Sequence, residues 1–181
     1  MIRVNNRRTI FFLLVTCFIF QSITAQEYIQ WSKSRKLEWK DFQGRPNEDV
    51  YAAALTSYKI EITPSKVIVD ENNNIKNFNE LTVKAYFYKN HSWVVEMNDY
   101  LLQHEQLHFD IAELFARKMR VEFKKLQAEK IANFDTYYGV YKKLWAACRE
   151  MQRAFDKESN HSINEVQNNL WVEKINSLLQ S

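Results

Sequence analysis

The stretch "NDYLLQHEQLHFDIAELFARKMRVEFKKLQAE", residues 98–129, decides the fold, because it is long, lacks glycine and proline, and repeats apolar residues every three or four positions. Such spacing places these residues on one face of a single long α-helix. Asn98 or Asp99 is a suitable N-cap. The inward stripe of this predicted helix contains two histidines among its apolar members: Leu101, His104, His108, Ile111, Phe115, Met119 and Phe123.

The sequence before this helix is typical of β-strands. The strongest candidate is "LTVKAYFYKNHSWV", residues 81–94, which alternates one apolar face with a second face; the apolar face consists of Leu81, Val83, Ala85 and Phe87. Weaker strand candidates are residues 36–44, 51–62 and 66–70, with turns predicted at 44–47 and 63–65.

The sequence after it is typical of two further helices. One runs from about Phe134 into the 150s, with an apolar stripe of Tyr137, Tyr141, Leu144, Trp145, Cys148 and Met151. The other runs from Ser162 to Leu179, is capped by Asn160 or Ser162, and is predicted to bury Ile163, Val166, Leu170, Ile175 and Leu178. Strands followed by helices predict an α+β domain, with a small mixed or antiparallel sheet followed by three helices.

Residues 1–25 have the layout of a secretory signal peptide, with a basic start, an apolar run from Ile10 to Phe20 and a small-residue exit at Ala25. The run is shorter than the roughly 20 residues that span a bilayer, which disfavours an uncleaved anchor. Cys17 is interpreted as part of this run rather than as a lipid attachment site. We therefore expect residues 26–181 to form one exported domain, periplasmic or extracellular, without stable membrane insertion after cleavage.

The mature chain is expected to be close to neutral. The whole chain has 25 Lys and Arg against 22 Asp and Glu, and residues 1–25 contain three arginines and no acidic residue. Without a basic cluster, nucleic acid is not an expected partner. Cys148 is then the remaining cysteine, which excludes an intramolecular disulfide. It is predicted to be a buried apolar residue rather than a catalytic thiol.

The segment from His104 to His108 is an H-E-x-x-H motif. Residues four apart lie one helical turn above each other, so both imidazoles can bind one zinc ion. Glu105 lies at the edge of the same site, where its carboxylate can act as the general base for an attacking water. Two histidines in an apolar stripe without a metal would each need another polar partner, which favours metal binding over coincidence.

A catalytic zinc ion usually has three protein ligands and one open position. His161, at the junction of the last two predicted helices, is the leading candidate for the third ligand, although an exposed loop histidine is the competing interpretation. Glu158 is the alternative ligand. Asp156 or Asp110 could orient a ligand imidazole from behind.

Two further polar residues are not expected to bind the metal. Glu113 is predicted to be a solvated helix residue, and His91 is predicted to lie at a strand end, at the surface or facing the substrate. A peptide substrate could pair with the strand that precedes the long helix.

Three ordered segments resemble a family of secreted bacterial domains of unknown function that are described as zinc-dependent proteases. These segments are "LEWKDFQG" (37–44), "HEQLHFDIAELFARKMR" (104–120) and "FDKESNHSINEVQNNLW" (155–171). The resemblance covers most of the mature chain, from about Trp31 to Ile175. It implies a zincin-like domain with the metal-binding motif on its first long helix.

The resemblance also implies roles for individual residues. His104 and His108 would bind the metal, Glu105 would be catalytic, and the later histidine, His161, would be important. The chain departs from the family pattern at Phe155, where a tyrosine is expected, and at Ser162, where glycine often follows the histidine. The first departure removes a hydroxyl that would be suited to stabilise an oxyanion.

Two functions follow from these observations. The first is a secreted or periplasmic zinc-dependent hydrolase, most simply a metallopeptidase with Zn²⁺ on His104, His108 and His161, Glu105 as general base, and a peptide or protein as substrate. The alternative is a non-catalytic cell-envelope protein that binds a partner through its helices, with a structural metal or none. The oligomeric state is not predicted.

Overall fold

The computed structural model describes residues 26–50 and 52–180. The predicted signal peptide, with Cys17, lies outside the described residues. Three helices follow the strands in sequence: α1 (Asp99–Ala128), α2 (Phe134–Ser159) and α3 (Glu165–Gln180). The strands are β1 (Tyr28–Gln30), β2 (Ala54–Leu55), β3 (Tyr58–Thr63), β4 (Thr82–Tyr88) and β5 (Trp93–Val94).

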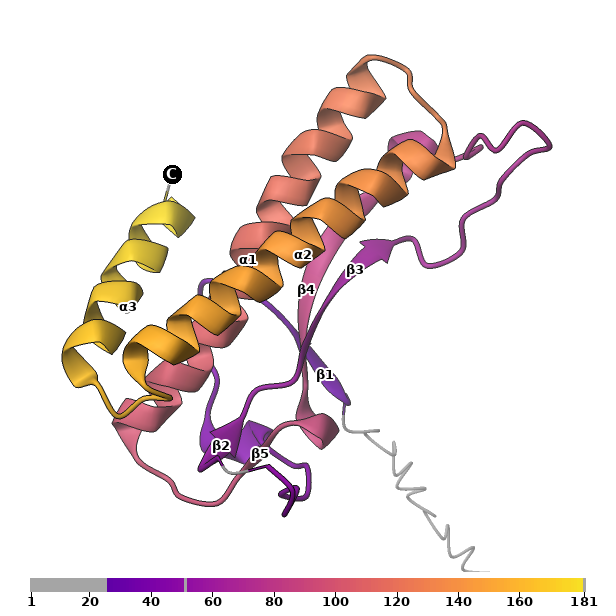
Figure 1. Cartoon of the computed structure of the whole chain (residues 1–181). Helices are drawn as coiled ribbons and strands as arrows, with labels where there is room; N and C mark the ends of the chain where they lie inside the picture. The colour runs from indigo at the N-terminus through magenta and orange to yellow at the C-terminus, as the bar shows by residue number, and fades with distance from the viewer. Residues whose placement is uncertain (1–25, 51, 181) are drawn as a thin grey trace, which may run out of the picture.

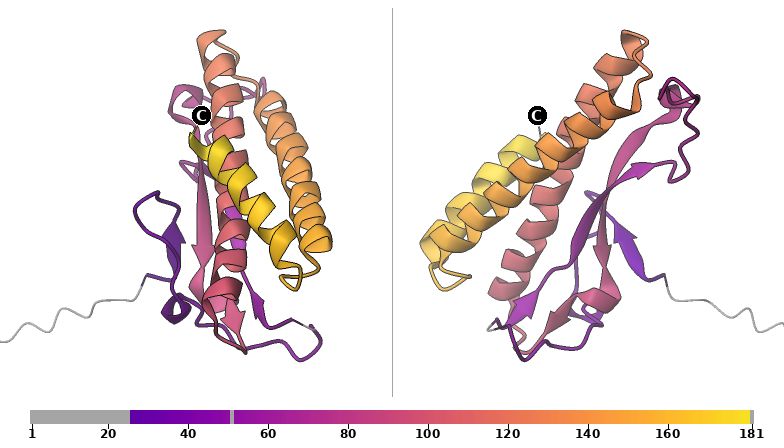
Figure 2. Two further views of the ribbon diagram at one scale, coloured as in Figure 1. Left: turned by 90° about the vertical axis from the view of Figure 1, so that its left-hand side faces the viewer. Right: turned by 45° about the vertical axis from the view of Figure 1, so that its right-hand side comes forward.

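The molecule has two layers, with the helices on one side of the sheet (Figures 1 and 2). The main sheet has the order β1-β4-β3, and the short strands β2 and β5 form a separate pair. All of these pairs are antiparallel. The predicted α+β class with three helices is confirmed, and the sheet is antiparallel rather than mixed.

Strand β4 forms the floor of the core. Its residues alternate between buried and half-buried positions, as its sequence predicts, because successive side chains of a strand point to opposite faces. Val83, Ala85 and Phe87 are at most 1% exposed and face α1. Because β4 is the central strand, the prediction that it offers a free edge to a peptide is wrong.

Helix α1 is the central element of the helical layer and packs against β4, α2 and α3. The side chain of Asn98 caps its start by accepting a hydrogen bond of 2.8 Å from the backbone N–H of Leu101. The predicted inward stripe is confirmed, since its members other than His108 are buried and His108 is half-buried.

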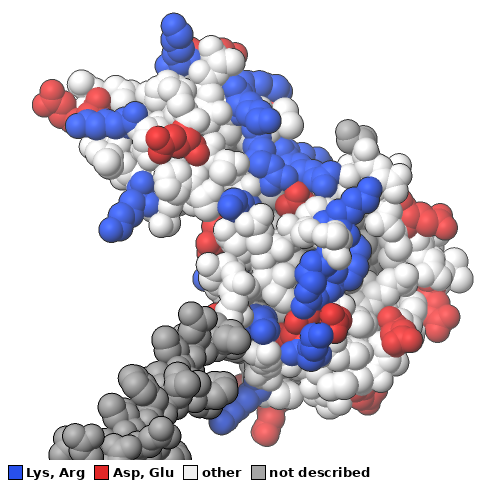
Figure 3. Space-filling view, turned by 180° about the vertical axis from the view of Figure 1, so that it is seen from behind, with Lys and Arg blue, Asp and Glu red and all other residues white. Residues whose placement is uncertain are grey.

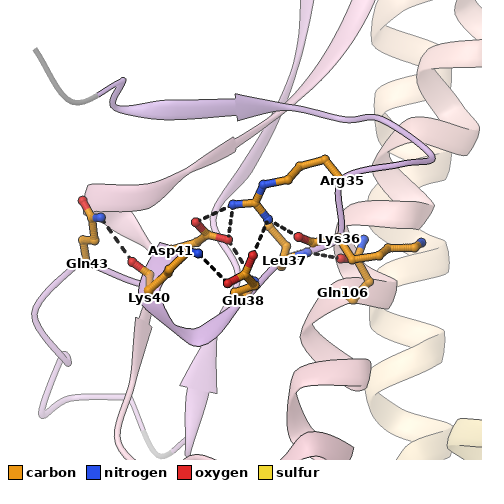
Figure 4. A network of polar contacts seen from close by, with 8 residues as sticks. All are labelled: Arg35, Lys36, Leu37, Glu38, Lys40, Asp41, Gln43 and Gln106. Carbon is orange, nitrogen blue, oxygen red and sulfur yellow. Dashed lines mark hydrogen bonds and ion pairs between the residues drawn. The ribbon is translucent and has the colours of Figure 1, made fainter. Parts of the chain in front are cut away.

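The segment before β2 is joined to α1 by hydrogen bonds (Figure 4). Arg35 binds both carboxylate oxygens of Asp41 at 2.8 Å, and the backbone N–H of Leu37 donates to Gln106 Oε1 at 2.7 Å. Gln106 in turn donates to Asp110 Oδ1 at 2.8 Å. Gln106, although it lies inside the H-E-x-x-H motif, therefore joins α1 to the N-terminal segment.

Gly44 allows a close approach of two backbone segments. A Cβ atom there would lie 2.9 Å from the carbonyl oxygens of Asn90 and Ser92. We expect Gly44→Ala to lower the free energy of unfolding by about 1–3 kcal/mol, because backbone atoms must move.

Gly139→Ala is the matched control for that substitution, because nothing lies within 4 Å of its Cβ position in α2. We expect this variant to gain about 0.5–1 kcal/mol from better helix propensity. Urea denaturation of both variants measures the two changes. Equal effects of the two substitutions would contradict the close approach at Gly44.

Three predictions about secondary structure are wrong. Residues 39–41 form a 3-10 helix instead of a strand, and residues 66–70 make only an isolated bridge between Val69 and Ile75. Helix α3 buries Asn168, Trp171 and Ile175, whereas four of its predicted inward residues are exposed: Ile163, Val166, Leu170 and Leu178. The face of α3 is set by a polar contact to α1, which apolar periodicity does not reveal.

Among the described residues, no helix covers the outer face of the main sheet (Figure 2). Tyr28 lies edge-on to Tyr86, with ring centroids 5.0 Å apart, and Lys59 lies over the Tyr88 ring. Seen from behind, the molecule shows basic side chains along its middle with acidic ones beside them (Figure 3). Within residues 26–50 and 52–180, no helix has the length and apolar character needed to cross a membrane.

Candidate metal centre

Two helices bring three possible metal ligands together. His104 and His108 lie one turn apart on α1, and Asp156 lies near the end of α2. The Nε2 atoms of the two histidines are 3.3 Å apart. Asp156 Oδ1 lies 3.4 Å from His104 Nε2 and 3.0 Å from His108 Nε2. Asp156, which was predicted at most to orient a ligand, thus belongs to the group that could hold a metal ion.

These distances fit one tetrahedral zinc ion. Zinc binds imidazole nitrogen and carboxylate oxygen at about 2.0–2.1 Å, and the corners of such a tetrahedron are about 3.3–3.4 Å apart. The two longer separations agree with that value, and the third is shorter by about 0.3 Å. Three donors of this set leave one position open, as catalytic zinc sites require.

Amide side chains hold both imidazoles in the tautomer that a metal needs. The Nε2–H group of Gln152 donates to the backbone carbonyl of His108 at 2.9 Å, so Gln152 Oε1 faces His108 Nδ1 at 2.5 Å and must accept a hydrogen bond from it. Asn168 Oδ1 lies 3.0 Å from His104 Nδ1. Each ring therefore donates from Nδ1, which is the usual outer support of a ligand histidine. The Nε2 atoms, which lie next to Asp156, are then the nitrogens that a metal ion could bind.

The electrostatics of the group favour a positive charge at its centre. Burial alone lowers the pKa of His108, but the hydrogen bond and charge of Asp156, with a contribution from Glu105, raise it to about 9. Burial would raise the pKa of Asp156, yet hydrogen bonds from His104 and His108 hold it well below its usual range. In the metal-free protein His108 is thus protonated at neutral pH, and its positive charge lies where the group favours a cation.

Phe155 supports the two imidazoles from below. Its ring is fully buried, with centroids 4.4 Å from His104 and 5.0 Å from His108. The ring of Trp171 packs against that of Phe155, with the two ring centroids 5.7 Å apart. Position 155 is therefore part of the core and does not line the cleft above the histidines, so its departure from the family pattern leaves the open side of the site unchanged.

Glu105 lies beside the ligand group and is 4% exposed. Its Oε2 atom is buried and has no hydrogen-bond partner among the described residues. An unpaired buried carboxylate oxygen is costly unless another group or a water satisfies it. Glu105 therefore has a buried carboxylate oxygen that is free to accept a hydrogen bond beside the ligand group.

A cleft of about 390 Å³ opens over these residues, a size within the usual range of small-molecule and peptide sites. Its walls are residues 50 and 52–56 on one side and Gln152, His161 and Ser162 on the other. Tyr58 is the tyrosine that lines it. Burial is the main cause that raises the pKa of Tyr58, so its hydroxyl stays protonated at neutral pH.

The other candidate residues near the end of α2 do not join the ligand group. His161 lies at the wall of the cleft and is exposed. Glu158 is exposed and accepts a hydrogen bond of 2.8 Å from Trp171 Nε1. The sequence-based choice between His161 and Glu158 thus contrasts with the structure, in which Asp156 occupies the third place.

The remaining candidates lie away from the cleft. Asp110 is buried and accepts from Trp31 Nε1 at 2.6 Å, so it holds the N-terminal segment rather than a ligand imidazole. Glu113, predicted to be solvated, is instead 6% exposed and binds Arg120 at 2.6 Å. His91 is exposed and stacks on Tyr88.

Cys148 is buried, as predicted, and lies on α2. Burial is the main cause that raises the pKa of its thiol to about 12. A thiol with this pKa is almost entirely protonated at neutral pH. The preference for a packing role over a catalytic thiol is therefore supported.

Three consecutive residues after α2 have a left-handed backbone, with φ of 48° at Asn160, 51° at His161 and 76° at Ser162. Glycine adopts this conformation without the steric cost that a Cβ atom adds. We expect Ser162→Gly to raise the free energy of unfolding by about 0.5–1 kcal/mol.

Ser177→Gly in α3 is the matched control for Ser162→Gly, because Ser177 is an exposed residue of a regular helix. This variant should be destabilised by about 0.5–1 kcal/mol. Thermal unfolding of both variants measures the changes. A loss of stability in Ser162→Gly would show that the left-handed turn is not strained.

Comparison with known proteins identifies a family but no close relative. A model of the bacterial protein family of unknown function DUF922 matches residues 34–162. No curated protein and no solved structure matches the chain. The matched range contains the three possible ligands and Glu105, and it ends before Asn168, which α3 contributes to the site.

Proposed function

We propose that this chain, which belongs to the DUF922 family of bacterial proteins of unknown function, is an exported zinc-dependent hydrolase that cleaves peptide bonds. The observation that carries the proposal is the convergence of His104, His108 and Asp156 next to the unpaired carboxylate oxygen of Glu105. The zincin-like character, the catalytic role and the export signal are all parts of this proposal.

The donor set is the reason for choosing zinc. Two neutral imidazoles and one carboxylate suit zinc, and the open fourth position distinguishes a catalytic site from a structural one. When bound, the ion would lower the pKa of a coordinated water to about 7 and polarise the substrate carbonyl. His104, His108 and Asp156 would hold it, with Asn168 and Gln152 fixing the imidazoles.

Glu105 would be the general base and, later, the general acid. Its carboxylate would take a proton from the attacking water and deliver it to the nitrogen of the departing amine. Enclosure by protein on most sides strengthens such a proton transfer, because few waters compete for the carboxylate. The side chain is nearly inaccessible in the free protein, so the substrate is expected to reach it through the cleft.

The strand β2 supports a peptide as the substrate. Strand β2 pairs with β5 in antiparallel register, with Ala54 opposite Val94. The backbone N–H of Val95 donates to the carbonyl oxygen of Ala53 at 2.7 Å, so the backbone groups on either side of Ala54, at Ala53 and Leu55, are those that face β5. The backbone groups of Ala54 then point away from β5, along the edge that borders the cleft. An extended peptide could pair with this edge, and the small side chains of residues 52–54 leave room for it.

Metal removal is the experiment that tests the proposal. We expect a strong chelator to abolish peptide cleavage by the mature chain, and one equivalent of Zn²⁺ to restore it, because the ion would lower the pKa of the attacking water and polarise the substrate carbonyl. A broad peptide library with mass-spectrometric detection is the measurement. If the mature chain did not bind stoichiometric zinc after reconstitution, the proposed zinc-dependent hydrolase activity would be excluded.

The alternative is a non-catalytic envelope protein that binds a partner through its helices. A groove between α1 and α2 favours it, because apolar Leu114, Val140 and Leu144 lie beside several cations, Lys118, Lys124 and Lys143 among them. Such a groove suits an acidic amphipathic segment of another protein. If this alternative holds, we expect substitution of Lys124 and Lys143 to abolish binding of the acidic partner. Glu105→Gln should not change that binding.

A further inference from the structure

We infer that His161 binds the carbonyl oxygen of the substrate as that oxygen becomes negatively charged, and that it is not a metal ligand. The inference rests on the proposed function, because it assigns a role within the same cleft. It gives His161 the role of stabilising the oxyanion, which His104, His108 and Asp156 would not provide.

The position of His161 is tied to the ligand Asp156. The backbone N–H of His161 donates to the carbonyl oxygen of Asp156 at 2.8 Å. The carboxylate of Asp156 faces His104 and His108, while His161 and Ser162 line the wall of the same cleft. The end of α2 therefore sets the distance of His161 from the reacting atoms.

The backbone at His161 is held in a conformation that costs free energy. A left-handed residue such as Asn160 is a common helix C-cap, but His161 and Ser162 extend this conformation by two further residues that are not glycine. Such strain persists where the surrounding structure maintains it, and it is concentrated at functional sites. The turn keeps the His161 side chain at the cleft.

The His161 imidazole is free to bind a substrate. It is exposed, and its side chain makes no hydrogen bond or ion pair with any described residue. By contrast, His104 and His108 are each held at Nδ1 by an amide. A ring nitrogen that carries a proton and faces the cleft can donate to a developing oxyanion, which is the largest single contribution in many hydrolases.

The ligand count argues against metal binding by His161. His104, His108 and Asp156 already provide three ligand atoms. A fourth protein ligand would close the site, as in structural zinc centres, and would leave no position for the reaction.

Inorganic phosphate, a tetrahedral anion, tests the inference without a known substrate. The mature chain is loaded with Co²⁺, whose visible absorption depends on its ligands, and is titrated with phosphate. We expect His161→Ala to bind Co²⁺ with the wild-type spectrum and to bind phosphate about 10- to 100-fold more weakly, because one hydrogen bond to a charged group is lost. His161→Gln, which retains a donor, should recover part of this affinity.

His91→Ala is the control, because His91 is also exposed but lies outside the cleft and stacks on Tyr88. It should leave phosphate affinity unchanged. Equal phosphate affinity in His161→Ala and wild type would overturn the inference alone, and so would an altered Co²⁺ spectrum in His161→Ala before phosphate is added. No Co²⁺ or Zn²⁺ binding by the wild type would overturn the proposed function and the inference together.

Discussion

Glu105→Gln is expected to reduce peptide hydrolysis by a factor of about 10²–10⁴ while zinc remains bound. The amide keeps the size of the side chain but cannot accept the proton of the attacking water. Since Glu105 is not one of the three ligand atoms, the affinity for zinc should stay within a few-fold of the wild type. Steady-state cleavage rates and metal content, measured on the same preparation, give both quantities.

Glu122→Gln is the matched control for Glu105→Gln. Glu122 lies on the same helix, is half-buried, and pairs with Lys125. Its substitution should change neither the cleavage rate nor zinc content. Full activity in Glu105→Gln would contradict the role of general base, and loss of zinc from that variant would place Glu105 among the ligands.

Asp156→Asn is expected to weaken zinc binding by more than about 100-fold. Loss of an outer partner of a metal ligand already costs about 10- to 100-fold, and Asp156 belongs to the group that could hold the ion directly. The variant keeps the shape of the side chain while it removes the negative charge. A competitive titration against a chromophoric chelator measures the affinity.

The same substitution has a second consequence in the metal-free protein. The contact with Asp156 raises the pKa of His108 to about 9 against the opposing effect of burial. Without the carboxylate, the pKa of His108 should fall, and NMR titration of its imidazole can follow this change.

Glu158→Gln and His161→Ala are the controls for Asp156→Asn, because His161 and Glu158 were the two candidates for the third metal ligand that the sequence suggested. We expect both variants to keep wild-type zinc affinity, since Glu158 binds Trp171 and His161 lies at the cleft wall. Tight zinc binding by Asp156→Asn, together with weak binding by either control variant, would transfer the third ligand to that residue.

The long helix and the central strand were predictable because their periodicity is local. Residues 98–129 have a strong three-to-four repeat, and α1 spans Asp99–Ala128. The alternation of β4 likewise gives the buried face correctly. In both cases one face of the element is covered along its whole length, so that the pattern of apolar residues reports the fold directly.

The third member of the possible ligand group was not predictable in this way, because it depends on how α2 is placed against α1. Gln152 and Asp156 lie one turn apart on α2, and this spacing was the available signal that both side chains face the same neighbour. Their partners His104 and His108 lie about 50 residues earlier. Only the packing of the two helices selects Asp156 over Glu158 and His161.

Buried polar residues explain the other differences. Asn168 is fully buried because it binds His104, so α3 presents a face that an apolar pattern does not indicate. Glu113 is buried because Arg117 and Arg120 neutralise it. Sequence patterns assume that polar residues face water, and this assumption fails where side chains pair inside the protein.

The position of the metal tests the central claim most directly. Crystals of the mature chain grown with Zn²⁺ can be measured on both sides of the zinc absorption edge, so that anomalous scattering locates the ion. We predict one site at about 2.0–2.2 Å from His104 Nε2, His108 Nε2 and a carboxylate oxygen of Asp156. An ion bound through His161 or Glu158 instead of Asp156, or no ion between the two histidines, would contradict the account.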